Sequence, residues 1–91
     1  MKRRGRFYPD LYVVTKILLL LADGHSRREA ALLSGLSYGR FQQYVEYLKE
    51  RGFVTGDEEL RLTPRGVEAA ARLAELIKEL TGEEPRSLKR R

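Results

Sequence analysis

The sequence contains no cysteine and only one histidine, His25, among its 91 residues. Without cysteine the chain can form neither a disulfide framework nor a thiolate metal site, and one histidine cannot build a zinc site. No Ser/His/Asp or Cys/His set is available for nucleophilic catalysis. We therefore expect no catalytic residues, no metal, no cofactor and no enzymatic activity, and no small-molecule substrate is evident.

Long hydrophobic runs are also missing. The longest, residues 17–22, is far shorter than the roughly 20 apolar residues of a membrane-spanning helix. The basic start of the chain is followed by residues 7–10, which read FYPD, and no cleavage-site pattern of a signal peptide follows them. We expect a soluble, cytoplasmic protein with no membrane partner.

Asparagine is absent, and glutamine occurs only at Gln42 and Gln43, whereas arginine is abundant. Because amide side chains are thermolabile, this depletion indicates a thermophilic source.

The net charge of +5 is concentrated at the two ends of the chain. Lys2, Arg3, Arg4 and Arg6 precede the body, and Arg86, Lys89, Arg90 and Arg91 follow it. Subtracting these eight charges from the total leaves residues 7–85 with a net charge of −3. Two basic tails of this kind suit phosphate contacts of low sequence content, and the alternative is that they only aid solubility.

Residues 26–52 have the pattern of two short helices joined by a turn. Ser26 can cap the first helix, and Glu29, three residues later, completes a capping box. Gly35 can adopt a positive φ where that helix stops, and Ser37 can cap the second helix. Leu36 is expected to fill the space between the two helices.

The second helix of this pair carries one apolar stripe. Phe41, Tyr44, Val45 and Leu48 follow the spacing i, i+3, i+4, i+7, and Gly52 ends the helix. The segment is therefore predicted to be a helix-turn-helix, whose second helix usually enters the major groove of DNA.

An earlier helix is predicted from Pro9 and Asp10 to about Ala22. Its apolar residues cover nearly the whole circumference, which is typical of a helix buried on more than one side. In so small a chain, we expect another subunit to supply the second covering surface.

Residues 53–55 and 60–62 are two short runs around a glycine turn, and they predict a β-hairpin. A hairpin directly after a helix-turn-helix is the wing of a winged helix. Thr63 as cap and Pro64 at the first helical position then begin a last helix, which Gly82 can terminate.

The last helix has an apolar stripe with two open interpretations. It packs on its own domain, or it forms a two-helix seam in a dimer. We favour a homodimer that also uses the first helix. The residues predicted at the dimer interface are Leu20, Ala70, Leu73, Ile77 and Leu80.

Five segments in a characteristic order resemble a known family. They are 12–20 (YVVTKILLL), 36–38 (LSY), 44–48 (YVEYL), 51–54 (RGFV) and 62–66 (LTPRG). Over roughly residues 10–80 the sequence resembles the archaeal stand-alone winged-helix DNA-binding proteins of about ten kilodaltons. These are classed as predicted transcriptional regulators, and some members are described as chromatin proteins.

The resemblance implies a winged helix that binds double-stranded DNA and dimerises through its C-terminal helix. The recognition helix would be Tyr38–Glu50, the wing Phe53–Leu62 and the dimerisation helix Pro64–Thr81. This chain departs from the family in two respects. Its last helix is shorter than in the chromatin-type members, and its wing carries acidic residues at 57–59.

The predicted fold class is mainly α with a small β-hairpin, a winged helix-turn-helix with an added C-terminal helix for dimerisation. The expected organisation is a basic arm over residues 1–9, a domain over 10–82 that includes the helix 64–81, and a basic tail over 83–91. No second domain is evident.

The exposed side of the recognition helix supplies the candidate contacts with DNA. Glutamine can pair with adenine and arginine with guanine, and a helix N-terminus can hold a phosphate. Two arginines at the start of the preceding helix oppose its dipole, which indicates an anion from outside or a tolerated cost. Two alternatives are open for Lys49, which could pair with a nearby acid or contact the DNA backbone. The predicted DNA-binding residues are Arg27, Arg28, Ser37, Tyr38, Arg40, Gln42, Gln43, Lys2, Arg3, Arg4 and Arg6.

The sequence thus favours a homodimeric, nucleoid-associated protein that binds double-stranded DNA, either as a transcriptional regulator or as a chromatin component. The alternative is a winged helix that docks another protein, because winged helices also serve as docking domains. The acidic wing favours docking, and the basic ends favour DNA.

Overall fold

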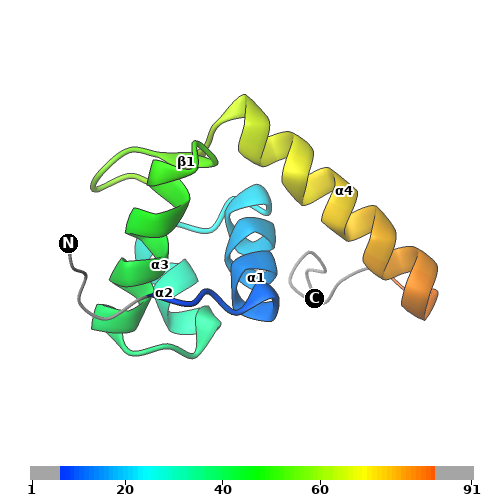
Figure 1. The fold of residues 1–91 in the computed structure, drawn as a ribbon, viewed down its shortest axis with the longest axis horizontal. Helices are drawn as coiled ribbons and strands as arrows, with labels where there is room; N and C mark the ends of the chain where they lie inside the picture. Colours follow the sequence, from blue (N-terminus) through cyan, green and yellow to red (C-terminus); the bar gives the residue numbers. More distant parts are fainter. Residues whose placement is uncertain (1–6, 84–91) are drawn as a thin grey trace.

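The computed structural model describes residues 7–83. Four helices and two short strands follow one another along the chain (Figure 1). They are α1 (Leu11–Ala22), α2 (Arg27–Ser34), α3 (Tyr38–Glu50), β1 (Val54–Thr55), β2 (Arg61–Leu62) and α4 (Pro64–Thr81). This order is that of a winged helix-turn-helix with an additional C-terminal helix, which confirms the predicted fold class.

Each helix begins at a side chain that accepts a hydrogen bond from a backbone N–H of its first turn. The caps are Asp10, Ser26, Ser37 and Thr63. The predicted capping box of α2 is present, since the Ser26 N–H donates to the Glu29 carboxylate at 2.9 Å. Gly35 ends α2 with φ of 78°. Side-chain caps of this kind typically stabilise a helix by about 1 kcal/mol each, so local sequence defines these helix ends.

The core forms around the C-terminal half of α1. Its residues Ile17–Leu21 are five consecutive buried side chains, and α3 contributes Phe41, Tyr44, Val45 and Leu48. Helix α1 packs against α2, α4 and β2 of the same chain. The second covering surface expected from another subunit is therefore supplied here by α4.

Two residues predicted at the dimer interface belong to this core. Leu20 and Ala70 are each only 3% exposed, so they leave no surface for a partner. Hydrophobic periodicity correctly indicated that these side chains lie on the packed sides of their helices. The residues that cover them, however, belong to the same chain. This part of the predicted interface is corrected accordingly.

Strands β1 and β2 form the wing as an antiparallel pair, with Val54 opposite Leu62 and Thr55 opposite Arg61. Gly56 begins the turn with φ of 98°, and a Cβ there would lie 2.1 Å from the carbonyl oxygen of Glu59. The turn is therefore so tight that only glycine fits. Residues 56–59 form this turn, and we call them the wing tip.

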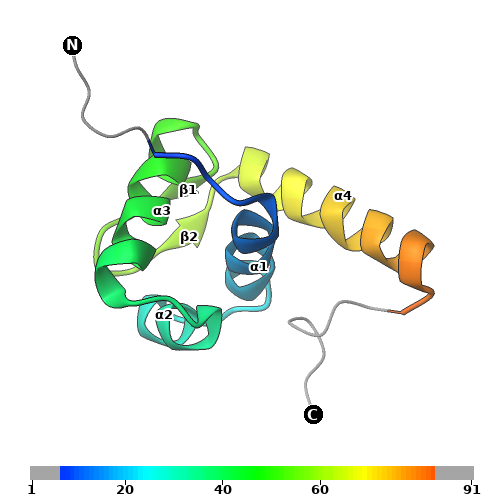
Figure 2. The ribbon, with the colours of Figure 1, turned by 60° about the horizontal axis from the view of Figure 1, so that its bottom comes forward.

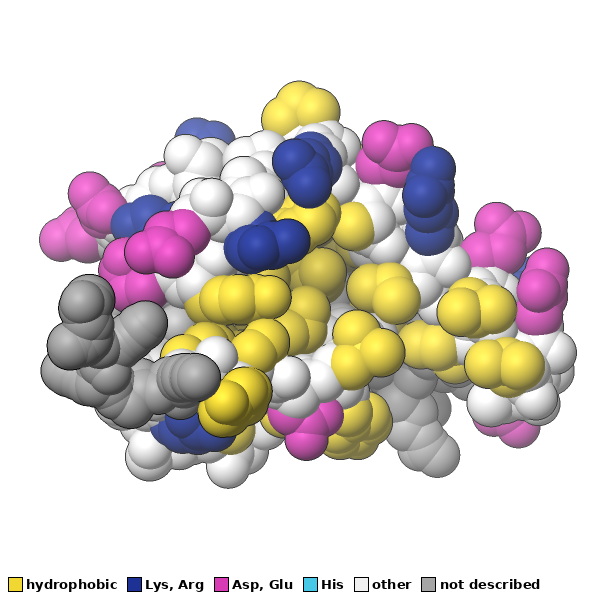
Figure 3. Space-filling model, in the orientation of Figure 1, with side chains coloured by type: hydrophobic (Ala, Val, Ile, Leu, Met, Phe, Trp, Pro, Cys, Tyr) yellow, Lys and Arg dark blue, Asp and Glu magenta, His cyan; other side chains and the backbone are white. Residues whose placement is uncertain are grey.

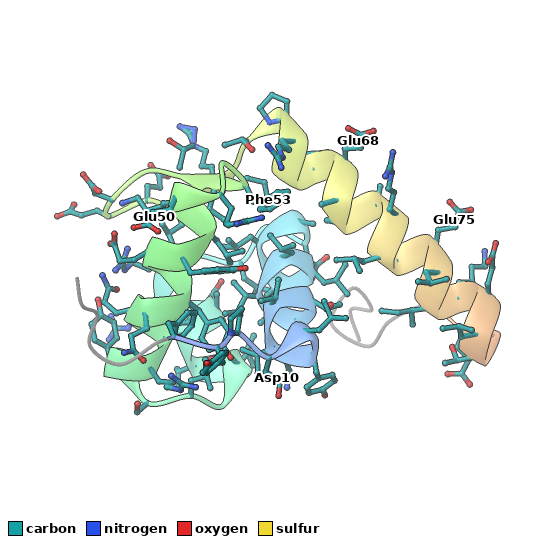
Figure 4. All side chains as sticks on the ribbon, viewed as in Figure 1. Asp10, Glu50, Phe53, Glu68 and Glu75 are labelled. Carbon is teal, nitrogen blue, oxygen red and sulfur yellow. The ribbon has the colours of Figure 1, made fainter. Side chains whose placement is uncertain are left out.

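Helix α4 leaves the wing and extends away from the three-helix body (Figures 1 and 2). Its first half packs closely, since the Gly66 backbone lies against the carbonyl of Phe53. Further along, Leu76 and Leu80 are 49% and 75% exposed. Glu68 and Glu75 point away from α1 (Figure 4). Within residues 7–83, no helix is long and apolar enough to cross a membrane.

Candidate nucleic-acid interface

Helix α3 presents its polar side to solvent, as its sequence predicts. The four apolar residues of the stripe are all buried, at 1% exposure or less. Tyr38 is 61% exposed, and Arg40, Gln43 and Glu46 are also exposed, whereas Gln42 is half-buried. The predicted separation into a core face and a free face is confirmed.

The N-terminal half of α3 is open and carries no carboxylate of its own. The Ser37 hydroxyl accepts a hydrogen bond from the Arg40 N–H at 3.2 Å, and this bond fixes where the helix begins. A Cβ built on Gly39 would meet no atom within 4 Å. No acidic residue occurs between Glu29 and Glu46 in the sequence. The positive end of the helix dipole therefore faces solvent with no carboxylate beside it in the sequence.

Arg40 and Gln43 form a pair on this half of the helix. Arg40 Nη1 donates to Gln43 Oε1 at 2.8 Å. The guanidinium carbon also lies 5.4 Å from the centre of the Phe7 ring and 5.5 Å from that of Tyr44. Both residues were predicted to contact DNA, and the structure places them together with the arginine held over aromatic rings.

Arg27, Tyr38 and Gln42 are also brought together. Arg27 Nη2 donates to the Tyr38 hydroxyl at 3.3 Å and to Gln42 Oε1, and Nη1 donates to the carbonyl oxygen of Asp57 at 2.5 Å. Arg27 lies at the start of α2, and the acceptors of its hydrogen bonds therefore belong to the same chain. Arg28 is exposed and makes no polar contact with the rest of residues 7–83.

The wing tip is attached to α3 by an ion pair. Lys49 Nζ lies 3.0 Å from Asp57 Oδ1. The hydrogen bond from Lys49, together with its charge, lowers the pKa of Asp57 below the ordinary value. Of the two alternatives for Lys49, the structure shows pairing with an acid.

A hollow of about 430 Å³ lies beside this ion pair. Its lining combines cations, carboxylates and polar groups from α2, α3 and the wing. The lining residues are Arg27, Tyr38, Gln42, Glu46, Lys49, Asp57 and Glu58. Three carboxylates thus face two cations.

A second hollow, of about 670 Å³, lies along the exposed side of α3. Phe7 forms one of its walls, with its ring centre 4.9 Å from that of Tyr44 and 5.5 Å from that of Tyr47. Glu46 and Glu50 also line it, and Glu50 lies on the outer side of α3 (Figure 4). Phe7 falls within the basic arm predicted over residues 1–9. An aromatic residue directly after a basic run was the available signal that packing begins there.

A groove lies between α1 and α4, and Leu73 lines it on the α4 side, whereas Ile77 and Leu80 lie further along the helix and do not line it. Leu73 and Ile77 are half-buried, and Leu80 is exposed. The groove has a volume of about 520 Å³, and Leu11, Val14 and Phe53 contribute to its lining. Hydrophobic side chains continue from α1 along α4 on this face of the molecule (Figure 3).

Comparison with protein families identifies the chain. Residues 15–89 match the family model described as wHTH-PRTase associated. The chain belongs to this family. No curated protein and no solved structure matches the sequence. The family confirms the winged helix-turn-helix class, whereas the archaeal origin and the regulator family remain predictions.

Several predicted site residues lie outside the described residues. They are Lys2, Arg3, Arg4 and Arg6 in the predicted basic arm. The basic tail predicted over 83–91 likewise lies outside them, apart from Glu83. Within residues 7–83, no three His, Cys, Asp or Glu side chains gather in a way that could hold a metal ion.

Proposed function

We propose that this protein binds double-stranded DNA through the N-terminal half of α3. The observation that carries the proposal is the charge distribution along that helix. Arg40 and Gln43 lie on the exposed side of the first half, and the carboxylates Glu46 and Glu50 lie in the second half. A recognition helix that inserts its N-terminal end into the major groove needs this distribution, because phosphates repel carboxylates.

Arg40 and Gln43 would read base edges in this mode. An arginine can donate two hydrogen bonds to guanine, and a glutamine can pair with the edge of adenine. Gly39 would let the helix backbone approach the DNA closely, since a Cβ at this position would point into open space. Arg28 and the eight basic residues at the chain ends would add contacts with the phosphate backbone that do not depend on sequence.

Titration of fluorescently labelled duplex DNA, followed by anisotropy at several salt concentrations, tests the proposal. Arg40→Ala should weaken binding to a cognate site by about 1–3 kcal/mol, as expected for a base contact. Arg72→Ala is the matched control, because Arg72 is exposed on α4 and, within residues 7–83, forms an ion pair only with Glu68, at 3.4 Å. No binding at low salt, a salt dependence near zero, or equal effects of the two variants would refute the proposal.

A homodimer would place two recognition helices on one DNA molecule. The exposed Leu76 and Leu80 of α4, together with the groove beside Leu73, are the surfaces that support it. Selection and sequencing of bound DNA fragments would separate the two DNA-binding roles. A sharp palindromic motif supports a regulator, and its absence supports a chromatin component.

A second candidate function is the docking of another protein on α3. The hollow beside Phe7 and Tyr47 combines aromatic walls with Glu46 and Glu50, and this chemistry suits a basic segment with an apolar anchor. The family description couples the winged helix to a PRTase, which favours a protein partner.

One variant separates the two candidates because it acts on them in opposite directions. Glu46→Lys combined with Glu50→Lys should strengthen binding to duplex DNA and abolish binding to a purified PRTase. Glu75→Lys with Glu79→Lys makes the same charge change on exposed positions of α4. Loss of PRTase binding in the α3 double variant alone, with no gain in binding to duplex DNA, would favour docking.

A further inference from the structure

Arg27 and Lys49 come from different helices and converge on one residue of the wing tip, Asp57. Arg27 Nη1 donates to its backbone carbonyl at 2.5 Å, and Lys49 Nζ lies 3.0 Å from its carboxylate oxygen Oδ1. Asp57 thus offers two oxygen acceptors, one neutral and one anionic, to two cationic donors. A phosphate group offers a similar set of oxygens to an Arg–Lys pair.

We infer that Arg27 and Lys49 form a phosphate-binding site that Asp57 of the same chain occupies, so that the wing tip must move before a phosphate can bind. The inference rests on the proposed function for the source of the phosphate, which is a phosphodiester of duplex DNA. The acidic wing then competes with the DNA backbone for these two cations.

The charges that line the hollow beside this ion pair support such a competition. With the wing tip in place, Glu46, Asp57 and Glu58 outnumber Arg27 and Lys49. Movement of the wing tip takes the carboxylates of Asp57 and Glu58 out of the hollow. Glu46 is then the one carboxylate of its lining that faces the two cations. The same surface therefore repels phosphate when the wing is closed and attracts it when the wing is displaced.

The construction of the wing allows this movement at little cost. Each strand has only two residues, and Asp57 and Glu58 are exposed. An exposed ion pair contributes little to stability, and small elements with few buried contacts open most readily. Val54 and Leu60 are buried and would hold the base of the hairpin while its tip moves.

The test compares Asp57→Asn with Glu59→Gln. Both substitutions remove one negative charge from the wing tip, but Glu59 has no polar side-chain contact with the rest of residues 7–83 and does not line the hollow. Each full-length variant is titrated with duplex DNA by anisotropy at several salt concentrations. Each is also titrated with inorganic phosphate while NMR follows the Arg27 side-chain N–H and the backbone amides of residues 26–28.

Asp57→Asn should bind duplex DNA about two- to fivefold more tightly than Glu59→Gln, the range expected when one exposed ion pair is lost. Its salt dependence should be steeper by about one to two units, because one or two further phosphates are engaged. Inorganic phosphate should shift the Arg27 signals at lower concentration in Asp57→Asn than in Glu59→Gln. Adding Arg27→Gln to Asp57→Asn should cancel the gain.

Equal DNA affinity and equal phosphate response in the two variants would overturn the inference. The loss of one negative charge anywhere on the wing tip would then explain both results. An Asp57→Asn gain that persists with Arg27→Gln would also overturn it. If no variant binds duplex DNA but Asp57→Asn takes up inorganic phosphate at Arg27, the site stands and the proposed function fails.

Discussion

The hydroxyl of Tyr44, which is buried in the core, accepts a hydrogen bond from the backbone N–H of Asp10 at 2.9 Å. Asp10 is the residue that caps α1, so this bond joins the start of the first helix to the middle of α3. The Phe7 ring packs edge-on against the same Tyr44 ring. The segment that leads into α1 is thereby positioned by the helix proposed to contact DNA.

Tyr44→Phe removes that acceptor and keeps the ring. We expect it to lower the free energy of unfolding by about 1 kcal/mol, since the Asp10 N–H loses its partner. Tyr47→Phe is the matched control, because the Tyr47 hydroxyl makes no hydrogen bond within residues 7–83. Thermal and urea unfolding, followed by circular dichroism, measures both. Equal losses in the two variants would contradict a stabilising role for the bond.

Two glycine-to-alanine substitutions should have opposite effects on stability. Gly39→Ala adds a methyl group in open space on α3, so helix propensity should stabilise the protein by about 0.5–1 kcal/mol. Gly66→Ala places a Cβ 2.1 Å from the Phe53 carbonyl oxygen, and this overpacking should cost about 1–3 kcal/mol. Unfolding in urea compares the two.

Gly39→Ala also tests how closely α3 approaches its ligand. If the backbone at Gly39 lies against DNA, the variant should be more stable but should bind duplex DNA more weakly. Unchanged affinity in the stabilised variant would show that the backbone at this position does not contact DNA. Circular dichroism and anisotropy on the same preparation give both results.

The wing ion pair predicts a pH dependence. Lys49 lowers the pKa of Asp57 below its ordinary value of 3.8 through a hydrogen bond and through its charge. Since the folded pKa is lower than the unfolded one, the stability that the pair contributes is complete above pH 3.8. It is lost as the pH falls through the lowered pKa of the folded state.

NMR titration of the side-chain carboxyl carbons measures this effect. The midpoint of Asp57 should lie below that of an unpaired aspartate and should rise in Lys49→Met. Lys78→Met is the control, because it removes the same charge from the last turn of α4. A midpoint that stays low in Lys49→Met would assign the shift to another group.

The sequence predicts most of the local structure because helix caps act within a single turn. The capping box of Ser26 and Glu29, the Gly35 stop and the Thr63 start all lie where their residue types indicate. It does not predict contacts between distant segments. The bonds from Arg27 to Asp57 and from Asp10 to Tyr44 join residues 30 and 34 positions apart.

The dimer prediction fails at Leu20 and Ala70 for a related reason. Hydrophobic periodicity indicates which side of a helix is apolar, but not which element covers that side. The course of α4 decides this, because Ala70 in its first half is buried in the core, whereas Leu80 near its end is 75% exposed. The interface proposed above is therefore confined to the distal part of α4 and the groove beside it.

Leu80→Lys tests that interface. Leu80 is 75% exposed near the end of α4, so a lysine there should leave the fold intact, and a cation near a helix C-terminus is favourable. Val67→Lys is the matched control, because Val67 is 54% exposed in the first half of the same helix. Sedimentation equilibrium should show a dimer for the parent protein and for Val67→Lys.

Leu80→Lys should shift the equilibrium towards monomer by at least tenfold in the dissociation constant, because a twofold axis places the substitution in the interface twice. DNA affinity should fall with it, since a monomer engages only one half-site. A parent protein that is monomeric at all concentrations would refute the dimer. A dimer that Val67→Lys disrupts and Leu80→Lys leaves intact would place the interface on the first half of α4.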